Sequence, residues 1–371
     1  MKKRFLIISI ILSTIIVFSE YFLYASLHSS GIIKSKQTGI IFMTLGFIFP
    51  VIFILSVRYS FRRYYLINSL LNVISSIWIV IVSYLFGVYL FIIILISINF
   101  NLNLHLQIEL IYNTLFICVL LTALYGIVHS RYIKIVQLEV KSDKLLKEWS
   151  NKKIVVISDT HIGNINRVRF MRKIVKIIKA ENPDIIFNVG DLIDGSAFPY
   201  KECFEPLSSL SPALGNHYVE GNHEKYSKDY KKFRLEFPKT LNDLTDKKII
   251  INDTQILGLG YRLKESGDEI ISRLKALNYD PNMPSIVLVH DPKNVKALST
   301  LGVSLVLSGH THSGQFFPFT IIIKYIYRKY AHGIAYTNNT ASVTSCGVGT
   351  SVVPMRIGTT PEIIVLTIKS E

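Results

Sequence analysis

Four long apolar stretches in the first part of the sequence constrain the fold more than any other feature. They cover residues 5–27, 39–57, 73–98 and 109–128. A helix needs about 20 apolar residues to cross the hydrocarbon core of a bilayer, and each stretch is close to or above this length. The first is longer than the apolar segment of a signal peptide, and no small-residue cleavage site follows it. The sequence therefore predicts a transmembrane domain of four helices over 1–135.

Basic residues lie at alternate ends of these stretches and indicate their orientation. They gather before the first stretch, between the second and third, and after the fourth, as Lys2, Lys3, Arg4, Arg58, Arg62, Arg63, Arg131 and Lys134. The opposite loops carry only Lys34 and Lys36 in one case, and no Lys, Arg, Asp or Glu over 99–107 in the other. Because loops rich in Lys and Arg remain in the cytoplasm, we expect an integral protein of the cell membrane with cytoplasmic termini and a cytoplasmic catalytic domain.

The net charge of +15 raises the alternative of a nucleic-acid-binding protein. The basic residues are scattered or gathered at membrane ends, so no nucleic-acid partner is expected. A transporter would require paired charges inside the membrane. The ionisable residues nearest the membrane, Glu20, His105 and Glu109, lie near the ends of the stretches. The apolar half therefore predicts an anchor rather than a transport pathway.

The second half opens with an apolar run at 154–158 that ends abruptly in Asp159, Thr160 and His161. Such a run is typical of a parallel strand that is buried on both faces. Asp159 and His161 are two residues apart, so in an extended segment both side chains point the same way. A carboxylate beside an imidazole is a pair that binds first-row divalent metals. Taken alone, the two residues are equally consistent with a cap and a surface histidine.

The same arrangement recurs along the chain. The strand predicted at 184–189 is followed by Asp191, the strand at 285–289 by His290, and the strand at 303–307 by His310 and His312. A helical pattern over 168–178 separates the first two strands, which predicts an α/β fold. Because α/β sheets bind their ligands at the carboxyl ends of the strands, these side chains are expected to meet.

The tripeptide Gly-Asn-His occurs twice, at 215–217 and at 221–223, and only one copy can belong to such a site. A short strand lies between the copies, and in the other motifs the ligands follow the strand. This order favours Asn222 and His223. The strand is predicted at 217–220, and the first copy is then expected to form the turn that enters it.

These motifs in this order resemble the calcineurin-like metallophosphoesterases, and in particular their bacterial membrane-associated branch. The resemblance covers about 152–371 and rests on DTH at 159–161, GDLID at 190–194, GNHE at 221–224, His290, GHTHSGQ at 309–315, and the tail residues Gly347, Gly349, Pro354, Arg356, Pro361 and Glu362. It implies an α/β (α+β) sandwich of two central β-sheets flanked by helices. Residues 136–151, with their mixed charges, are expected to be a linker.

The resemblance also implies a dinuclear metal site. It assigns Asp159, His161 and His312 to one ion and Asn222, His290 and His310 to the other, and Asp191 would bridge the two. Oxygen and imidazole ligands suit Mn, Fe, Zn or Ni. His223 lies beside a ligand without being one, and is expected to protonate the leaving group or to stabilise the phosphoryl oxygens.

We therefore expect a membrane-anchored, metal-dependent phosphoesterase that hydrolyses phosphate ester or pyrophosphate bonds. The alternative is a binding or sensor module built on a catalytically weak phosphoesterase fold. Ligand loss would indicate such a module, and none of the seven positions is lost.

Segment 316–330 mixes aromatic, aliphatic and basic residues directly after Gln315. This mixture is typical of an interfacial helix or flap, and it predicts an amphiphilic substrate such as a lipid-linked or nucleotide-linked lipid phosphate. Phe316, Phe319 and Arg356 are the expected substrate contacts. The alternative is a helix buried over a sheet edge.

Overall fold

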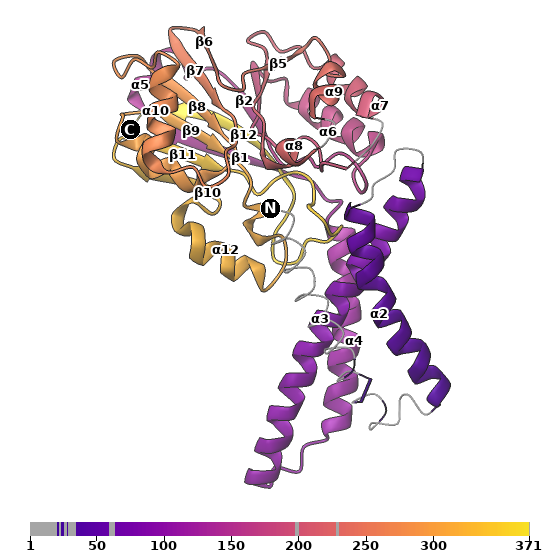
Figure 1. The fold of residues 1–371 in the computed structure, drawn as a ribbon. Coiled ribbons are helices and arrows are strands. Elements are labelled where there is room, and N and C mark those ends of the chain that lie inside the picture. The colour runs from indigo at the N-terminus through magenta and orange to yellow at the C-terminus, as the bar shows by residue number, and fades with distance from the viewer. Residues whose placement is uncertain are drawn as a thin grey trace. The chain divides into compact units, whose positions relative to one another are not determined.

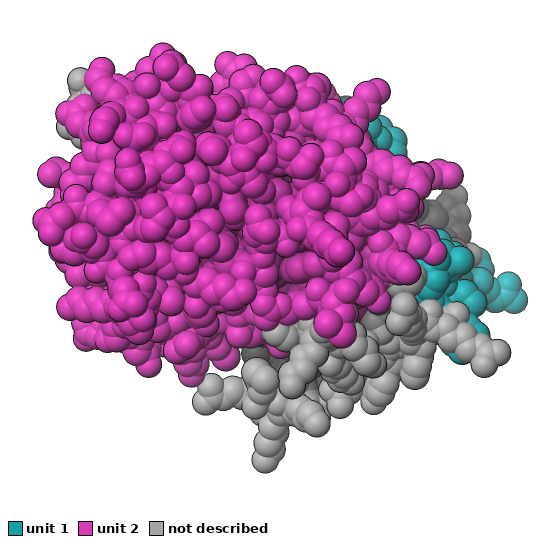
Figure 2. All heavy atoms as spheres, turned by 90° about the horizontal axis from the view of Figure 1, so that it is seen from above, with its two compact units in different colours: residues 1–128 teal, residues 129–371 magenta. Residues whose placement is uncertain are grey.

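The computed structural model describes residues 21, 24, 25, 28, 35–58, 64–196, 200–227 and 230–370. The chain divides into two compact units, residues 1–128 and 129–371, which Figure 2 shows in different colours. Figure 1 gives the helix and strand labels used below.

Unit 1 consists, within its described part, of apolar helices that are long enough to cross a membrane. They are α2 (Lys36–Arg58), α3 (Tyr65–Leu102) and α4 (Ile108–His129), of which the last residue already belongs to unit 2. Three of the four predicted stretches thus correspond to helices. The stretch at 5–27 lies mostly outside the described residues.

Helix α3 is longer than its predicted apolar stretch of 73–98. Its 38 residues extend over about 57 Å at the rise of an α-helix, which exceeds the hydrocarbon thickness of about 30 Å. The additional first turns carry Asn68 and Asn72, whose side-chain amides donate to the carbonyl (3.1 Å) and the hydroxyl (3.0 Å) of Ser56 in α2. These bonds join α2 to α3. Asn68 and Asn72 are polar, so a prediction based on apolar runs leaves them outside the stretch.

Unit 2 contains two six-stranded mixed sheets. The first has the order β1 (Lys134–Lys141), β12 (Glu362–Lys369), β2 (Ile154–Ile157), β3 (Ile185–Asn188), β4 (Asn216–Tyr218), β5 (Leu241–Asp243). The second has the order β10 (Gly333–Thr337), β11 (Thr340–Thr344), β9 (Leu305–Ser308), β8 (Ser285–Val289), β7 (Thr254–Leu259), β6 (Lys247–Ile251). The expected α/β fold with two central sheets is confirmed.

Parallel pairing dominates the centre of both sheets. β2, β3 and β4 pair in parallel, as do β7, β8 and β9. The carboxyl ends of these strands therefore lie at one edge of their sheet. Apolar side chains from both sheets, among them Val156, Phe187, Leu288 and Leu307, share one buried cluster.

Helices complete unit 2. They are α5 (Asp143–Trp149), α6 (Val168–Glu181), α7 (Tyr200–Phe204), α8 (Asn222–Tyr226), α9 (Tyr230–Leu235), α10 (Gly267–Ala276), α11 (Val295–Ser299) and α12 (Phe319–Tyr327). Helix α6 buries Phe170, Met171, Ile174, Val175 and Ile178. This spacing is the helical periodicity that the sequence predicted.

The linker expected over 136–151 is wrong. β1 pairs with β12 along eight residues, and α5 buries Leu145 and Trp149 completely. The Trp149 indole also donates to the Thr254 hydroxyl of β7 at 2.8 Å. β1 is an edge strand in which exposed polar or charged residues alternate with apolar ones that are half-buried or, at Val140, fully buried, and the charged residues of this pattern resemble those of a linker.

Candidate metal centre

Seven side chains predicted to be metal ligands come from loops at the carboxyl ends of central strands. Asp159 and His161 follow β2, and Asp191 follows β3. His290 follows β8, His310 and His312 follow β9, and Asn222 begins α8 after β4. The structure brings all of them together as two neighbouring groups.

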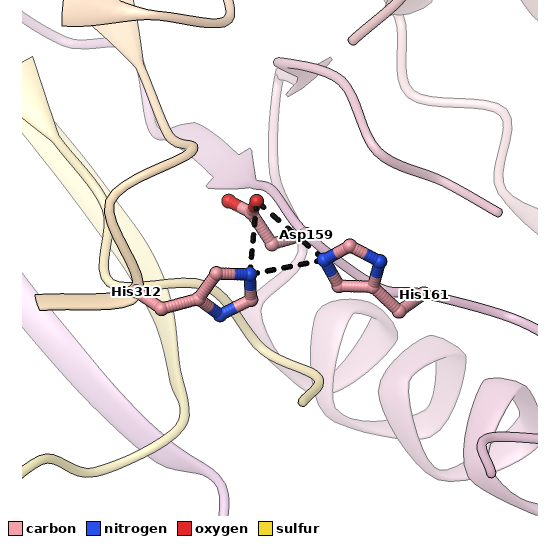
Figure 3. Close-up of side chains that lie close together, drawn as sticks. All are labelled: Asp159, His161 and His312. Carbon is pink, nitrogen blue, oxygen red and sulfur yellow. Dashed lines mark hydrogen bonds and ion pairs between the residues drawn. The ribbon is translucent and has the colours of Figure 1, made fainter. Parts of the chain in front are cut away.

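The first group consists of Asp159, His161 and His312, and Figure 3 shows their side chains pointing toward one another. The Nε2 atoms of His161 and His312 lie 3.0 Å apart. Oδ1 of Asp159 lies 3.3 Å from Nε2 of His312 and 3.8 Å from Nε2 of His161. All three side chains are buried. One carboxylate oxygen and two imidazole nitrogens thus face a common point.

The second group consists of Asp191, His290, His310 and Asn222. Nε2 of His290 lies 3.1 Å from Oδ2 of Asp191 and 3.1 Å from Oδ1 of Asn222. A nitrogen of His310 lies within 4.8 Å of the ligand atoms of Asp191 and His290. Oδ2 of Asp191 is also 3.8 Å from Nε2 of His161 in the first group. Asp191 therefore faces both groups, as a bridging carboxylate must.

An unpaired carboxylate oxygen tests whether these residues fit a cation. Oδ1 of Asp159 is fully buried and accepts no hydrogen bond within the described part of the chain. It faces the Nε2 atoms of His161, His290 and His312 at 3.3–3.9 Å. A buried, unpaired carboxylate oxygen is costly unless a cation compensates it. The oxygen and nitrogen donors thus fit divalent metal ions.

The backbone at five of these positions is left-handed. They are Asp159 (φ 54°), His161 (47°), Asp191 (53°), His310 (71°) and His312 (46°). Residues other than glycine adopt this conformation rarely, and it concentrates at functional sites. The turns direct the side chains toward the edge of the sheets instead of along the strands.

Close backbone approach explains two glycines of the motifs. A Cβ atom on Gly221 would lie 2.2 Å from Oδ1 of Asp191, and one on Gly309 would lie 2.5 Å from Oδ2 of Asp159. Both positions therefore need a residue without a side chain. The motif glycines make room for the two carboxylates.

Burial and charge determine which groups are ionised. Burial raises the pKa of Asp159 to about 6 and lowers the pKa values of His161 and His312 well below the usual value. Burial also acts to raise the pKa of Asp191, but His290, His223 and His161 together outweigh burial, and the pKa of Asp191 falls well below its usual range. Against burial, Asp191 raises the pKa of His290 to about 10. His161 and His312 are thus neutral, the form in which histidine binds metals.

The two Gly-Asn-His copies lie in different surroundings. His223 is placed at the site, with its ring centroid 4.6 Å from that of His161 and its backbone N–H donating to Oδ1 of Asp191 at 2.8 Å. Nδ1 of His223 lies 2.9 Å from the Asp194 carbonyl. His217 lies instead within β4, where it is buried and Nε2 contacts the Leu214 carbonyl at 2.9 Å. His217 is the first residue of the strand predicted at 217–220, and β4 indeed contains it.

Glu224 is a functional residue that the sequence reasoning missed. Its buried carboxylate accepts from the backbone N–H groups of Gly221 (2.8 Å), Asp191 (3.1 Å) and Ile193 (3.1 Å). It therefore joins the loop after β3 to the start of α8. Its position as the fourth residue of GNHE was the available signal, because an acidic residue at N3 of a helix closes a capping box.

Three tyrosines surround the site, of which Tyr327 belongs to the segment 316–330 and the other two were not predicted. The ring centroid of Tyr261 lies 6.1 Å from that of His310, and the centroid of Tyr327 lies 6.4 Å from it. Tyr226 lies 5.8 Å from His223. Tyr226 lies three residues after His223 on α8, a helical spacing that was available in the sequence, whereas no such spacing connects Tyr261 or Tyr327 with His310.

The substrate contact expected from Arg356 is contradicted. Arg356 is fully buried, and its guanidinium donates to the carbonyls of His312 (3.0 Å), Cys346 (2.8 Å) and Gly349 (2.6 Å). Arginine suits this position because five donors satisfy several acceptors at once. Phe319 is about half exposed, and its ring packs against that of Phe316; their predicted contact with substrate stays a prediction.

A further group of possible ligands, His332, Cys346 and Glu362, has internal partners. His332 pairs with the Glu362 carboxylate at 3.0 Å, and the Cys346 thiol donates to the Thr360 carbonyl. This group is therefore explained as a structural ion pair and hydrogen bonds.

Comparison with known proteins agrees with this site. Residues 152–314 match the family model described as calcineurin-like phosphoesterase. An uncharacterized metallophosphoesterase of Aquifex aeolicus (strain VF5) is 30% identical over 268 residues, which cover 69% of this chain and 99% of that protein. The chain belongs to the metallophosphoesterase family, and the resemblance inferred from the motifs is confirmed.

Other relatives are longer than the matched region. An uncharacterized metallophosphoesterase of Helicobacter pylori (strain J99 / ATCC 700824) is 33% identical over 243 residues, 63% of this chain and 63% of that protein. A Danio rerio protein named transmembrane protein with metallophosphoesterase domain is 30% identical over 262 residues, 67% of this chain and 60% of that protein. The match thus spans about 60% of the length of these two relatives.

Proposed function

We propose that the chain is a membrane-anchored metallophosphoesterase that holds two divalent cations and hydrolyses a phosphate ester or pyrophosphate bond. The observation that carries the proposal is the convergence of seven Asp, Asn and His side chains, with Asp191 between two groups. Family membership supports the same class of reaction. A catalytically weak binding module would not need a complete set of ligands.

One cation would be held by Asp159, His161 and His312, and the other by Asn222, His290 and His310, with Asp191 shared. Mixed oxygen and imidazole ligands suit Mn, Fe, Zn or Ni. When bound, such a pair supplies Lewis-acid polarisation of the phosphoryl oxygens.

His223 is assigned the proton transfer. The Asp194 carbonyl only accepts, so Nδ1 of His223 carries a hydrogen and Nε2 is left to exchange a proton with substrate. Water adds to phosphorus and loses a proton to the solvent, the bond from phosphorus to the leaving oxygen breaks, and protonated Nε2 gives its proton to that oxygen. Nε2 then regains a proton from the solvent, which completes the balance. Glu224 supports this step indirectly, because it fixes the backbone of Asp191 and Gly221.

The proposal also places the protein in the bilayer, with its catalytic domain on the cytoplasmic side. Apolar helices long enough to span a membrane and the name of the Danio rerio relative support anchoring. Arg58 at the end of α2 and Arg131 after α4 support the cytoplasmic orientation. A phosphatase reporter that requires export, fused after Glu371, should be inactive, whereas a fluorescent protein fused there should fold in the cytoplasm. The reverse pair of results would overturn the orientation.

Metal content tests the dinuclear site. Asp191→Ala in the detergent-purified full chain should lower bound metal from about two ions to one or fewer per chain and abolish hydrolysis across a panel of phosphoesters. Asp268→Ala, an exposed aspartate on α10, is the matched control and should change neither quantity. Unchanged metal content in Asp191→Ala would contradict the bridging role, and an inactive parent chain with full metal content would favour the binding module.

A further inference from the structure

We propose that helix α12 lies in the interface of the bilayer and holds the metal centre at the lipid surface. The inference rests on the membrane anchoring of the proposed function. It deepens that proposal by naming the surface that contacts lipid. Figure 1 shows α12 apart from the two sheets, at the periphery of unit 2.

The outer face of α12 is apolar. None of its nine residues is buried, and Phe319, Ile321, Ile322, Tyr325 and Ile326 are 45–82% exposed. Phe317, immediately before the helix, is also exposed. Single exposed apolar residues are ordinary on a soluble protein, but a contiguous apolar patch indicates an interaction site.

The outer side of α12 differs from that of an ordinary surface helix. Thr320, Ile323 and Tyr327 recur at helical spacing and are only partly exposed, so this face is turned toward unit 2. A surface helix usually directs polar residues to the other side, as α6 does with its Arg and Lys residues. In α12 that side carries the large apolar side chains, which therefore face something other than water.

Charge identifies lipid headgroups as the partner. Lys324, Arg328 and Lys329 are exposed beside the apolar face. The sequence contains no Asp or Glu between Asp291 and Glu362. A short helix with an apolar face and a basic flank is the arrangement that lies in an anionic membrane surface.

Covalent continuity favours the bilayer over a second protein. α4 ends at His129 and β1 begins at Lys134. The four residues between them can extend over at most about 14 Å. Unit 2 is therefore tethered close to the membrane in which α4 is proposed to lie. For an exposed apolar helix of unit 2, this tether makes the effective concentration of the bilayer high.

The location of α12 connects this surface to the metal centre. The helix follows the His312–Gly314 turn, which contains a predicted ligand, after four residues. Its last residue, Tyr327, lies 6.4 Å from the ring of His310. An amphiphilic phosphoester could thus keep its apolar part in the bilayer while its phosphate reaches the ions.

The depth of a fluorescent label in the bilayer tests the docking of α12 without a measurement of catalysis. The full chain with Cys118→Ser, whose other cysteines Cys203 and Cys346 are buried, is reconstituted in nanodiscs containing phosphatidylglycerol. A label on Tyr325→Cys should show blue-shifted emission and be quenched by doxyl-labelled lipid. A label on Ile250→Cys, an exposed position on β6, should remain solvent-like. Equal, solvent-like emission at both positions would overturn the proposal. Blue-shifted emission at Tyr325→Cys without quenching by the labelled lipid would also overturn it, because protein and not lipid would then cover the helix.

Kinetics provide the second arm. Replacing Ile322, Tyr325 and Ile326 by Ser should raise KM several-fold for a phospholipid-like ester in vesicles and leave hydrolysis of a soluble aryl phosphate diester unchanged. Equal loss on both substrates would mean that the outer face supports the fold, which contradicts docking. Absence of all hydrolysis in the parent chain would remove the proposed function, while the label depth would still decide the position of α12.

Discussion

Substituting the two histidines of the duplicated motif separates chemistry from packing. His223→Ala should reduce turnover by about 100- to 10,000-fold, since it removes a general acid. At about 1.36 kcal/mol per tenfold change, this is roughly 3–5 kcal/mol of activation free energy. Metal content should be retained, because His223 is not assigned as a ligand. The loss should be larger for an alkyl ester than for a nitrophenyl ester, whose leaving group needs no proton.

His217→Ala should act on stability instead. His217 is buried in β4, contacts the Leu214 carbonyl at 2.9 Å and packs with its ring 5.9 Å from that of Phe187. Loss of a hydrogen bond costs about 1 kcal/mol, and the cavity and lost burial add about 1–3 kcal/mol. The free energy of unfolding should therefore fall by about 2–4 kcal/mol, with turnover per folded molecule unchanged.

Three measurements on the purified variants decide between these roles. They are the thermal midpoint in detergent, the bound metal by elemental analysis, and kcat on the two esters at saturating metal. The reasoning is refuted if His217→Ala lowers kcat while its thermal midpoint stays at that of the parent chain. It is also refuted if the loss in His223→Ala is independent of the leaving group.

Two predictions concern packing residues. Trp149→Ala should lower the free energy of unfolding by about 3–5 kcal/mol, and Lys147→Ala, on the exposed side of α5, should change it by less than about 0.5 kcal/mol; equal thermal midpoints would mean that α5 is outside the core. Arg356→Lys keeps the charge but loses the planar fork of donors, so bound metal and the thermal midpoint should both fall. If both stay at parent values, the contact of Arg356 with His312 does not position that ligand.

The central strands and the candidate ligands were accessible to sequence reasoning because they combine two strong signals. β2, β3, β8 and β9 are continuous apolar runs, as expected for strands buried on both faces. Polar residues of metal-binding type follow each run. Since parallel strands end at the same edge, their proximity follows from topology alone.

The remaining features depend on tertiary contacts. β1 alternates exposed and half-buried residues at a sheet edge, and its pairing with β12 joins residues more than 200 positions apart. The ring of Tyr261 and the buried position of Arg356 likewise arise only when distant loops meet. The first turns of α3 contain asparagines that only their partner Ser56 makes compatible with an apolar helix.

The left-handed backbone at the candidate ligands links the lifetime of the protein to metal supply. Each such residue raises the energy of the folded state by on the order of 1 kcal/mol, and the unpaired oxygen of Asp159 adds to it. Cations that bind only the folded chain would offset this cost by an amount that grows with the logarithm of their free concentration. In a metal-starved cell a larger fraction of the chain would unfold and become open to proteolysis. The amount of this protein in the cell would then follow the supply of divalent cations, even where no phosphoester substrate is present.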